Sequence, residues 1–353
     1  MVPELYKSLI MEIRPRLQSV NVYITLLKPE PVVIGLYTNN FVVNIGAKKQ
    51  VIHTKEFCIK PNSLTCFSNR NNQVTFRFAT DSFEQQLGTS QCELLELNMK
   101  SCTISVATDM IPLLKNKCYE IICKNCSKVF CEEAIFNRIL PLPENLDLSD
   151  WFCHAHPEKF SIIPKVNEVF YSECFVFLSP DLLNGIEKKD SVLHCRGCST
   201  WVGTLEKGVV KVWFNTVIFV GSSFTHTSTA LTDCLKILQI GNSPYLRPVR
   251  VIIKYVGNSC DKVILLWILE ACLRVNFNNK VINNVAKVLY KLEKNGTDLI
   301  SQWMSDINVT VFDVSQPMFK ELEKHLEEMS RYIPKDFSVS NGFRVSYIKH
   351  LTD

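Results

Sequence analysis

The chain has 353 residues, of which 46% are hydrophobic and 21% charged, a balance typical of a folded globular protein. Its formal net charge of +4 is spread thinly, and no run of Lys and Arg exceeds two residues. Because nucleic-acid binding needs a basic stripe, we expect no direct nucleic-acid partner. The longest apolar run, Val263 to Leu269, is far shorter than the roughly 20 residues that cross a membrane, so no membrane partner is expected.

The 15 cysteines of the chain indicate its cellular compartment. Charged residues interrupt the first twenty positions, so the start does not resemble a secretory signal peptide. Thiols that stay free or bind metal are typical of reducing compartments. We expect the protein in the cytoplasm, with the nucleus as a second location.

Residues 1–115 are predicted to form an N-terminal antiparallel β domain. Short β-branched or alternating runs end at Asn, Gly or Pro turns, which is typical of strands. The predicted strands are Val20–Leu26, Val32–Tyr37 and Val74–Ala79. A short helix is predicted from Val2 to Met11, with Pro15 stopping it.

Residues 116–225 are predicted to form a β region that a metal site holds together. Its expected strands are Tyr119–Ile122, Thr200–Thr204 and one long strand from Val209 to Val220. Residues 137–165 are predicted to be an ordered but irregular loop, because Pro141 and Pro143 cannot lie inside a helix.

Residues 226–353 are predicted to be an α+β region with a mixed antiparallel sheet and helices. The expected strands are Val249–Val256, Lys262–Leu269 and Asn308–Val314. Apolar residues at three- and four-residue intervals predict a helix between Gln316 and Tyr332, capped by Ser315 and ended by Pro334. The run from Ala286 to Leu292 fits a strand or a helix. The predicted fold class is therefore mainly β with an α+β C-terminal part.

Two Cys-x-x-Cys pairs are the most specific chemical signal in the chain. Each pair, Cys123 with Cys126 and Cys195 with Cys198, has the spacing of a zinc knuckle, and Gly197 is expected to permit a tight turn. Together they predict one closed, structural Zn²⁺ site with four cysteine ligands. Unligated thiols are one alternative. A redox pair is another, although it would need a helix after the first cysteine.

Cys153 and His154, which lie between the two pairs, leave several interpretations open. They could complete a different site with Cys123 and Cys126, although neighbouring side chains of an extended segment point to opposite sides. Cys153 could instead be a buried structural thiol under Trp151, or a free thiol on a loop stiffened by prolines. No phosphate loop, nucleophile elbow or His-Glu-x-x-His motif is present, so the residues alone show no active site.

The middle of the chain resembles a known family. The stretch from Phe136 to Asn145, followed by Asp150-Trp151-Phe152-Cys153-His154, is similar to the signature of the HECT-like E3 ubiquitin-protein ligases of type D. Members are described as binding proteins of a cell-cycle ubiquitin-conjugating enzyme. The two cysteine pairs and the closing run Gly342–Lys349 are also similar. The resemblance runs from about residue 120 to the end, and the N-terminal part matches only in being β-rich.

This chain departs from the signature at three positions. The family usually has a Ser between the second proline and Glu-Asn, but here Glu144 follows Pro143 directly. Leu146 stands where the family has Trp, and Phe152 where some members have a first Cys. Cys153 is therefore the one thiol that this motif offers.

The resemblance implies an E3 transferase that binds a ubiquitin-conjugating enzyme (E2) and ubiquitin and promotes ubiquitin transfer to protein substrates. A true HECT ligase keeps its thioester cysteine near the C-terminus, whereas this chain has no cysteine after Cys272. No residue can be named as the ubiquitin acceptor.

The same segment also resembles a loop by which family members cap the zinc endonuclease of pre-mRNA 3′-end processing, a metallo-β-lactamase. A thiolate is a strong zinc ligand, and prolines reduce the entropy lost when a loop inserts. The alternative function is therefore a non-catalytic chaperone that binds this enzyme through Cys153. The proposed capping residues are Cys153, His154, Trp151, Leu140, Pro141, Leu142 and Pro143.

Overall fold

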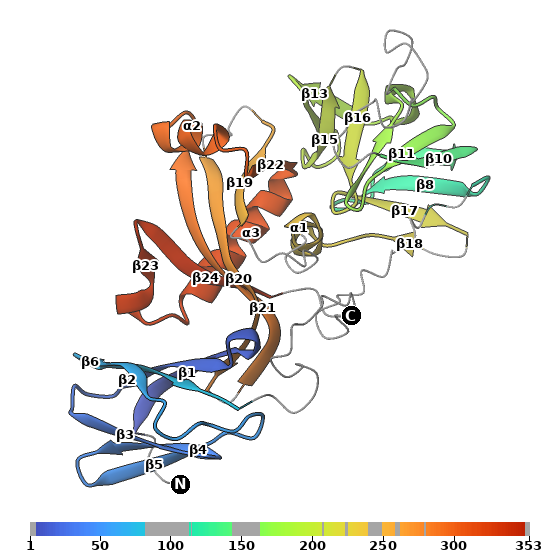
Figure 1. Cartoon of the computed structure of the whole chain (residues 1–353). Helices are drawn as coiled ribbons and strands as arrows, with labels where there is room; N and C mark the ends of the chain where they lie inside the picture. Colours follow the sequence, from blue (N-terminus) through green and yellow to red (C-terminus); the bar gives the residue numbers. More distant parts are fainter. Residues whose placement is uncertain are drawn as a thin grey trace.

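The computed structural model describes residues 5–81, 113, 115–142, 163–206, 208–222, 225–238, 249–257, 262–278 and 280–349. These residues form mainly β-strands, with a few helices in the C-terminal third, which confirms the predicted fold class. Figure 1 shows the N-terminal strands at the bottom, a C-terminal sheet with its helices above them, and the middle region at the upper right. The proposed domain boundaries, after residues 115 and 225, stay predictions.

The N-terminal third is a two-layer β structure. A three-stranded sheet, in the order β3-β4-β5, packs on β1, β2 and β7. Phe41, Phe76 and Phe78 meet in the core between these layers, with ring centroids 5.5 to 6.2 Å apart. The strands are β1 (Tyr6–Arg14), β2 (Ser19–Leu26), β3 (Val32–Tyr37), β4 (Asn40–Ile45), β5 (Lys48–His53), β6 (Thr65–Arg70) and β7 (Gln73–Ala79).

The helix predicted from Val2 to Met11 is wrong, because Tyr6–Arg14 forms strand β1. This strand lies between β2 and β20 in the sheet, and its side chains enter one hydrophobic core on each face. Leu9, Ile10 and Met11 are consecutive and all buried, so the apolar spacing reflects a strand buried on two sides. Pro15 still ends the element, since it begins the short 3-10 helix η1 (Pro15–Leu17).

The middle region packs two sheets against each other. One has the order β10-β11-β12-β16-β15-β14-β13, and the other has the order β18-β17-β8-β9. Buried residues of both sheets, such as Ile121, Val176, Val212 and Phe219, share one core. The strands are β8 (Cys118–Cys123), β9 (Val129–Ile135), β10 (Arg138–Pro141), β11 (Glu168–Tyr171), β12 (Phe175–Leu178), β13 (Ile186–Lys189), β14 (Val192–Cys195), β15 (Trp201–Glu206), β16 (Val209–Trp213), β17 (Val217–Gly221) and β18 (Thr225–His226); the 3-10 helix η4 is Pro180–Leu182.

The single long strand predicted from Val209 to Val220 is wrong, because it is divided into β16 and β17, which belong to different sheets. The turn between them is stabilised by Thr216, whose hydroxyl donates to the carbonyls of Val202 and Trp213, both at 2.7 Å. These bonds satisfy the backbone where the chain leaves one sheet for the other.

The C-terminal third matches most of its predicted elements. Its elements are α1 (Ala230–Leu238), β19 (Val249–Tyr255), β20 (Lys262–Phe277), β21 (Lys280–Lys294), α2 (Asp298–Met304), β22 (Val309–Val314), α3 (Gln316–Ser330), η5 (Lys335–Phe337), β23 (Val339–Ser340) and β24 (Phe343–Lys349). Ser315 caps α3 as predicted, since its hydroxyl accepts from the amide of Met318 at 3.2 Å. The ambiguous run from Ala286 to Leu292 is part of strand β21, while α1 and α2 were not predicted.

Two packing arrangements connect the thirds of the chain. First, β1 pairs with β20, so N-terminal and C-terminal strands share one large sheet. Second, α1 and α3 lie between this sheet and the middle region, where Trp201 and Trp213 pack into the same core as Leu322 (Figure 1).

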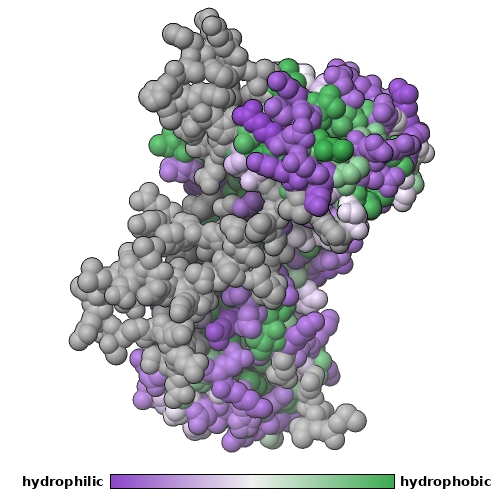
Figure 2. Space-filling view, turned by 90° about the vertical axis from the view of Figure 1, so that its right-hand side faces the viewer, coloured by the Kyte–Doolittle hydropathy of each residue, from purple (hydrophilic) through white to green (hydrophobic). Residues whose placement is uncertain are grey.

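Among the residues that the structure describes, no helix combines the length and apolar character needed to cross a membrane. On the face shown in Figure 2, hydrophilic residues predominate among the coloured ones, and hydrophobic residues form separate patches.

Candidate metal centre

The two Cys-x-x-Cys pairs occupy equivalent turns between antiparallel strands. Cys123 ends β8 and Cys195 ends β14. In each turn, the serine directly after the second cysteine donates its backbone N–H to the carbonyl of the first cysteine. The two distances agree closely, at 2.9 Å for Ser127 and 2.8 Å for Ser199. Both serines have a left-handed backbone, with φ of 58° and 56°. The two hairpins therefore present their thiols in the same way.

Gly197 has a different role from the one predicted. Its φ is not in the left-handed region, which Ser199 occupies instead. A Cβ at this position would lie 3.1 Å from Lys128 Cδ and 3.3 Å from Cys126 Sγ, so the lack of a side chain permits the close approach of the two turns. The Gly197 amide also donates to Cys195 Sγ at 3.3 Å.

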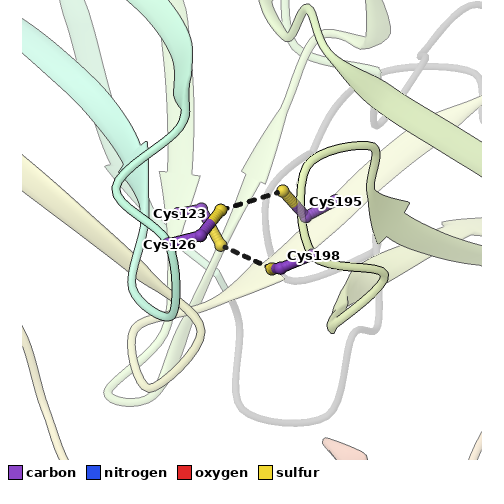
Figure 3. Close-up of side chains that lie close together, drawn as sticks. All are labelled: Cys123, Cys126, Cys195 and Cys198. Atoms are coloured by element: carbon purple, nitrogen blue, oxygen red, sulfur yellow. Dashed lines mark hydrogen bonds between the residues drawn. The ribbon is translucent and has the colours of Figure 1, made fainter.

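The four thiols converge on one point between the two turns (Figure 3). Cys123 Sγ lies 3.7 Å from Cys198 Sγ, Cys126 Sγ lies 3.6 Å from Cys195 Sγ, and all four sulfurs lie within 4.8 Å of one another. A tetrahedral ion about 2.3 Å from each sulfur would separate the sulfurs by about 3.8 Å. These cross-pair distances are far longer than a disulfide of about 2.05 Å. The cluster thus fits a metal ion held by four cysteines.

The local electrostatics of the thiols also fit a metal site. Hydrogen bonds from Asn125 and Thr200 lower the pKa of Cys198 to about 6, whereas burial raises the pKa of Cys123 to about 12. Cysteines bind a metal ion as thiolates, so binding of an ion here would release protons. A redox function is disfavoured, because each pair is followed by a strand, β9 or β15, rather than by a helix.

A buried polar network, which no sequence motif marks, connects the first cysteine turn to the C-terminal helices. Lys124 donates to the carbonyl of Ser228, whose hydroxyl donates to the Asp233 carboxylate at 2.7 Å. Asn215 also donates to Asp233 at 2.7 Å and accepts from Ser315, the cap of α3, at 3.0 Å. The one available signal was Asp233, the single carboxylate of α1, on a helix whose only other charged residue is Lys236.

His194 contacts the second turn rather than the thiols. Its Nδ1 lies 3.1 Å from the carbonyl oxygen of Ser199. His194 therefore supports the backbone of the turn, while the four cysteines alone form the cluster among the described residues.

Part of the proposed capping loop lies on a strand. Residues Arg138–Pro141 form β10, which pairs in parallel with β11, so this part of the predicted irregular loop is wrong. Pro141 is tolerated because β10 lies at the edge of its sheet among the described strands, so an outward amide is not needed. Leu140 lies on this strand, and the Leu142 amide donates to the Tyr171 carbonyl at 2.7 Å. Pro143, Trp151, Cys153 and His154 lie outside the described residues.

Comparison with known proteins gives one match. A family model described as HECT-like ubiquitin-conjugating enzyme (E2)-binding matches residues 12–345. The match includes the N-terminal strands, so the similarity extends well beyond the region from about residue 120 that the motifs indicated. No curated protein and no solved structure matches the chain.

Proposed function

Since the chain belongs to the family of HECT-like E2-binding proteins, we propose that it is an E3 that binds a ubiquitin-conjugating enzyme and promotes ubiquitin transfer to protein substrates. The family match over residues 12–345 is the observation that carries this proposal. The continuous sheet built from N-terminal and C-terminal strands supports a function of the whole chain, because neither part forms that sheet alone.

The thiols of the metal cluster and two buried thiols are poorly suited to a thiol relay. Four cysteines belong to the metal cluster, and burial raises the pKa of both Cys174 and Cys234 far above neutrality. A thiol that stays protonated and buried is a poor ubiquitin acceptor. We therefore propose that the chain positions a charged E2 beside its substrate and uses none of these six thiols as a relay.

Single-turnover discharge of a ubiquitin-charged cell-cycle E2 tests the proposal. The chain should bind the E2 and accelerate transfer to free lysine or to itself, without a ubiquitin adduct on the chain that thiol reductants cleave. A reductant-sensitive adduct would replace the scaffold mechanism by a thiol relay. If the chain neither binds the E2 nor changes the discharge rate, the E3 proposal is wrong.

We propose Zn²⁺ as the ion of the four-cysteine cluster. Four soft thiolates in a closed tetrahedral set suit zinc, and such a set has no open position for catalysis. The ion would cross-link the β8–β9 and β14–β15 hairpins. The many cysteines outside any disulfide agree with the cytoplasm, and also the nucleus, as the proposed location.

A second proposed function is capping of the mRNA 3′-end endonuclease through Cys153. It is supported by the anchoring of Leu140 and Pro141 on β10, which fixes the chain where it enters the loop. Cys153→Ala should abolish co-purification of the endonuclease and leave E2 discharge unchanged. Retained co-purification would refute a role of this thiol.

A further inference from the structure

A polar groove lies between the N-terminal strands and the C-terminal part of the chain. It has a volume of about 450 Å³ and is lined by residues of β2, β6 and β7 on one side and of η5 on the other. Tyr23 and Phe337 join the two sides, with ring centroids 5.4 Å apart in an edge-to-face contact. This volume is within the usual range of ligand sites, which often lie where two parts of a protein meet.

The strand register explains why the groove is polar. Asn21 pairs with Arg77, and Thr75 pairs with both Tyr23 and Ser68. Alternate residues of a strand share one face, so these polar side chains lie on the groove side. Their apolar neighbours on the opposite face, including Val20 and Phe78, fill the N-terminal core.

Two arginines give the groove its positive charge. Arg77 Nε donates to Asn21 Oδ1 at 2.7 Å, and Asn21 Nδ2 donates to Glu12 at 3.0 Å, which orients the guanidinium. Within the described part of the chain, the two terminal nitrogens of Arg77 and the whole guanidinium of Arg70 have no hydrogen-bond partner. Oriented guanidinium groups suit the oxygens of a carboxylate or a phosphate.

Three further features favour a peptide over a small free anion. Thr75 is only 8% exposed, lines the groove, and has a hydroxyl with no partner among the described residues. Asp336, on the opposite rim, can accept from a peptide N–H. Among the strands that the structure describes, β6 ends the path of the large sheet, so its outer edge can pair with an added extended segment.

We propose that this groove binds an extended protein segment that carries an oxyanion, either an Asp or Glu carboxylate or a phosphorylated side chain, over Arg70 and Arg77. The binding site is inferred from the groove itself. Only the identification of the bound segment as part of a substrate rests on the proposed E3 function. Binding is measured without E2 or ubiquitin, so the two proposals can fail separately.

Fluorescence anisotropy with labelled nine-residue peptides tests this site on the full chain. One peptide alternates Glu with Thr or Val, a second has Gln in place of every Glu, and a third carries one phosphoserine in the Gln background. We expect saturable binding of the Glu peptide, the phosphopeptide or both, and at least about tenfold weaker binding of the Gln peptide, equal to about 1.4 kcal/mol. The stronger of the two anionic peptides identifies the source of the oxyanion.

Variants locate the binding. Arg70→Gln and Arg77→Gln should each weaken binding by about tenfold, because each removes charge-assisted hydrogen bonds. Arg70 is exposed and outside the hydrogen-bond network, so its variant should fold even if Arg77→Gln does not. Arg138→Gln, an exposed arginine on β10, is the matched control and should bind like the wild type. Equal binding of all three peptides, no saturable binding, or equal loss in Arg138→Gln and Arg70→Gln would overturn the proposal.

Discussion

Glu12 Oε1 lies 2.7 Å from Lys287 Nζ, although the two residues are 275 positions apart in sequence. This ion pair joins β1 of the N-terminal third to β21 of the C-terminal third. Tyr347 donates to the same oxygen at 2.5 Å, and Asn21 donates to the other oxygen at 3.0 Å. The buried carboxylate is therefore fully hydrogen-bonded at the junction where the shared sheet is formed.

Removing one partner of this pair should destabilise the protein strongly. Glu12→Ala leaves the Lys287 ammonium partly buried without its counter-ion, and we expect a loss of about 3 kcal/mol in the free energy of unfolding. Adding Lys287→Met should cost less than the sum of the single changes, because the pair acts as one unit. Urea unfolding measures both. The exposed pair of Lys60 and Asp81, 3.5 Å apart, is the control, and Lys60→Met should cost under about 1 kcal/mol.

The same pair predicts a loss of stability in acid. Burial alone would raise the pKa of Glu12, but Lys287, Tyr347 and Asn21 together hold it below its ordinary value of 4.5. A depressed carboxyl pKa contributes stability that is present above the unfolded value and is lost as the pH falls through the folded value. Between about pH 6 and about pH 3, the unfolding free energy should fall more steeply for the wild type than for Glu12→Gln. Parallel curves would contradict the assignment.

The buried Asp233 carboxyl predicts that the free energy of unfolding also depends on pH in the opposite direction, with stability lost as the pH rises. Burial raises the pKa of this carboxyl above its ordinary value of 3.8, although Ser228 and Asn215 donate to it. A raised pKa means that stability is fully present below the unfolded value and is lost as the pH rises through the folded value. Asp233→Asn should remove this dependence and fold well, because the amide oxygen can still accept both bonds. Asp233→Ala should cost about 1 to 3 kcal/mol, since two buried donors lose their acceptor. A neutral result for Asp233→Ala in thermal unfolding would show that the network does not hold α1.

The sequence predicts local elements well and long-range pairing poorly. The strands around Val20 and Val74 and the helix capped by Ser315 are confirmed, since alternation, turn residues and caps act locally. The spacing of strand β1 is also that of a helix, and β20, the strand that pairs with its outer edge, is distant in sequence. A single sequence contains no signal for that pairing.

The candidate site shows the same limit. The four cysteines could be predicted because the Cys-x-x-Cys spacing is itself the geometric requirement of a metal knuckle. The network from Lys124 to Asp233 and Ser315 could not, because its members come from separate segments and have no motif. The polar groove that contains Arg70 and Arg77 could not be predicted either, because its lining depends on the register of three strands and on the position of η5.

The metal content of the purified chain, measured by elemental analysis, tests the central claim most directly. We predict one zinc per chain, and no stoichiometric zinc in the Cys123→Ser/Cys195→Ser double variant, because each change removes a ligand from a different hairpin. The matched control is Cys58→Ser, an exposed thiol outside the cluster, which should keep its zinc. A wild-type chain without zinc, or a double variant that retains it fully, would contradict the four-cysteine site.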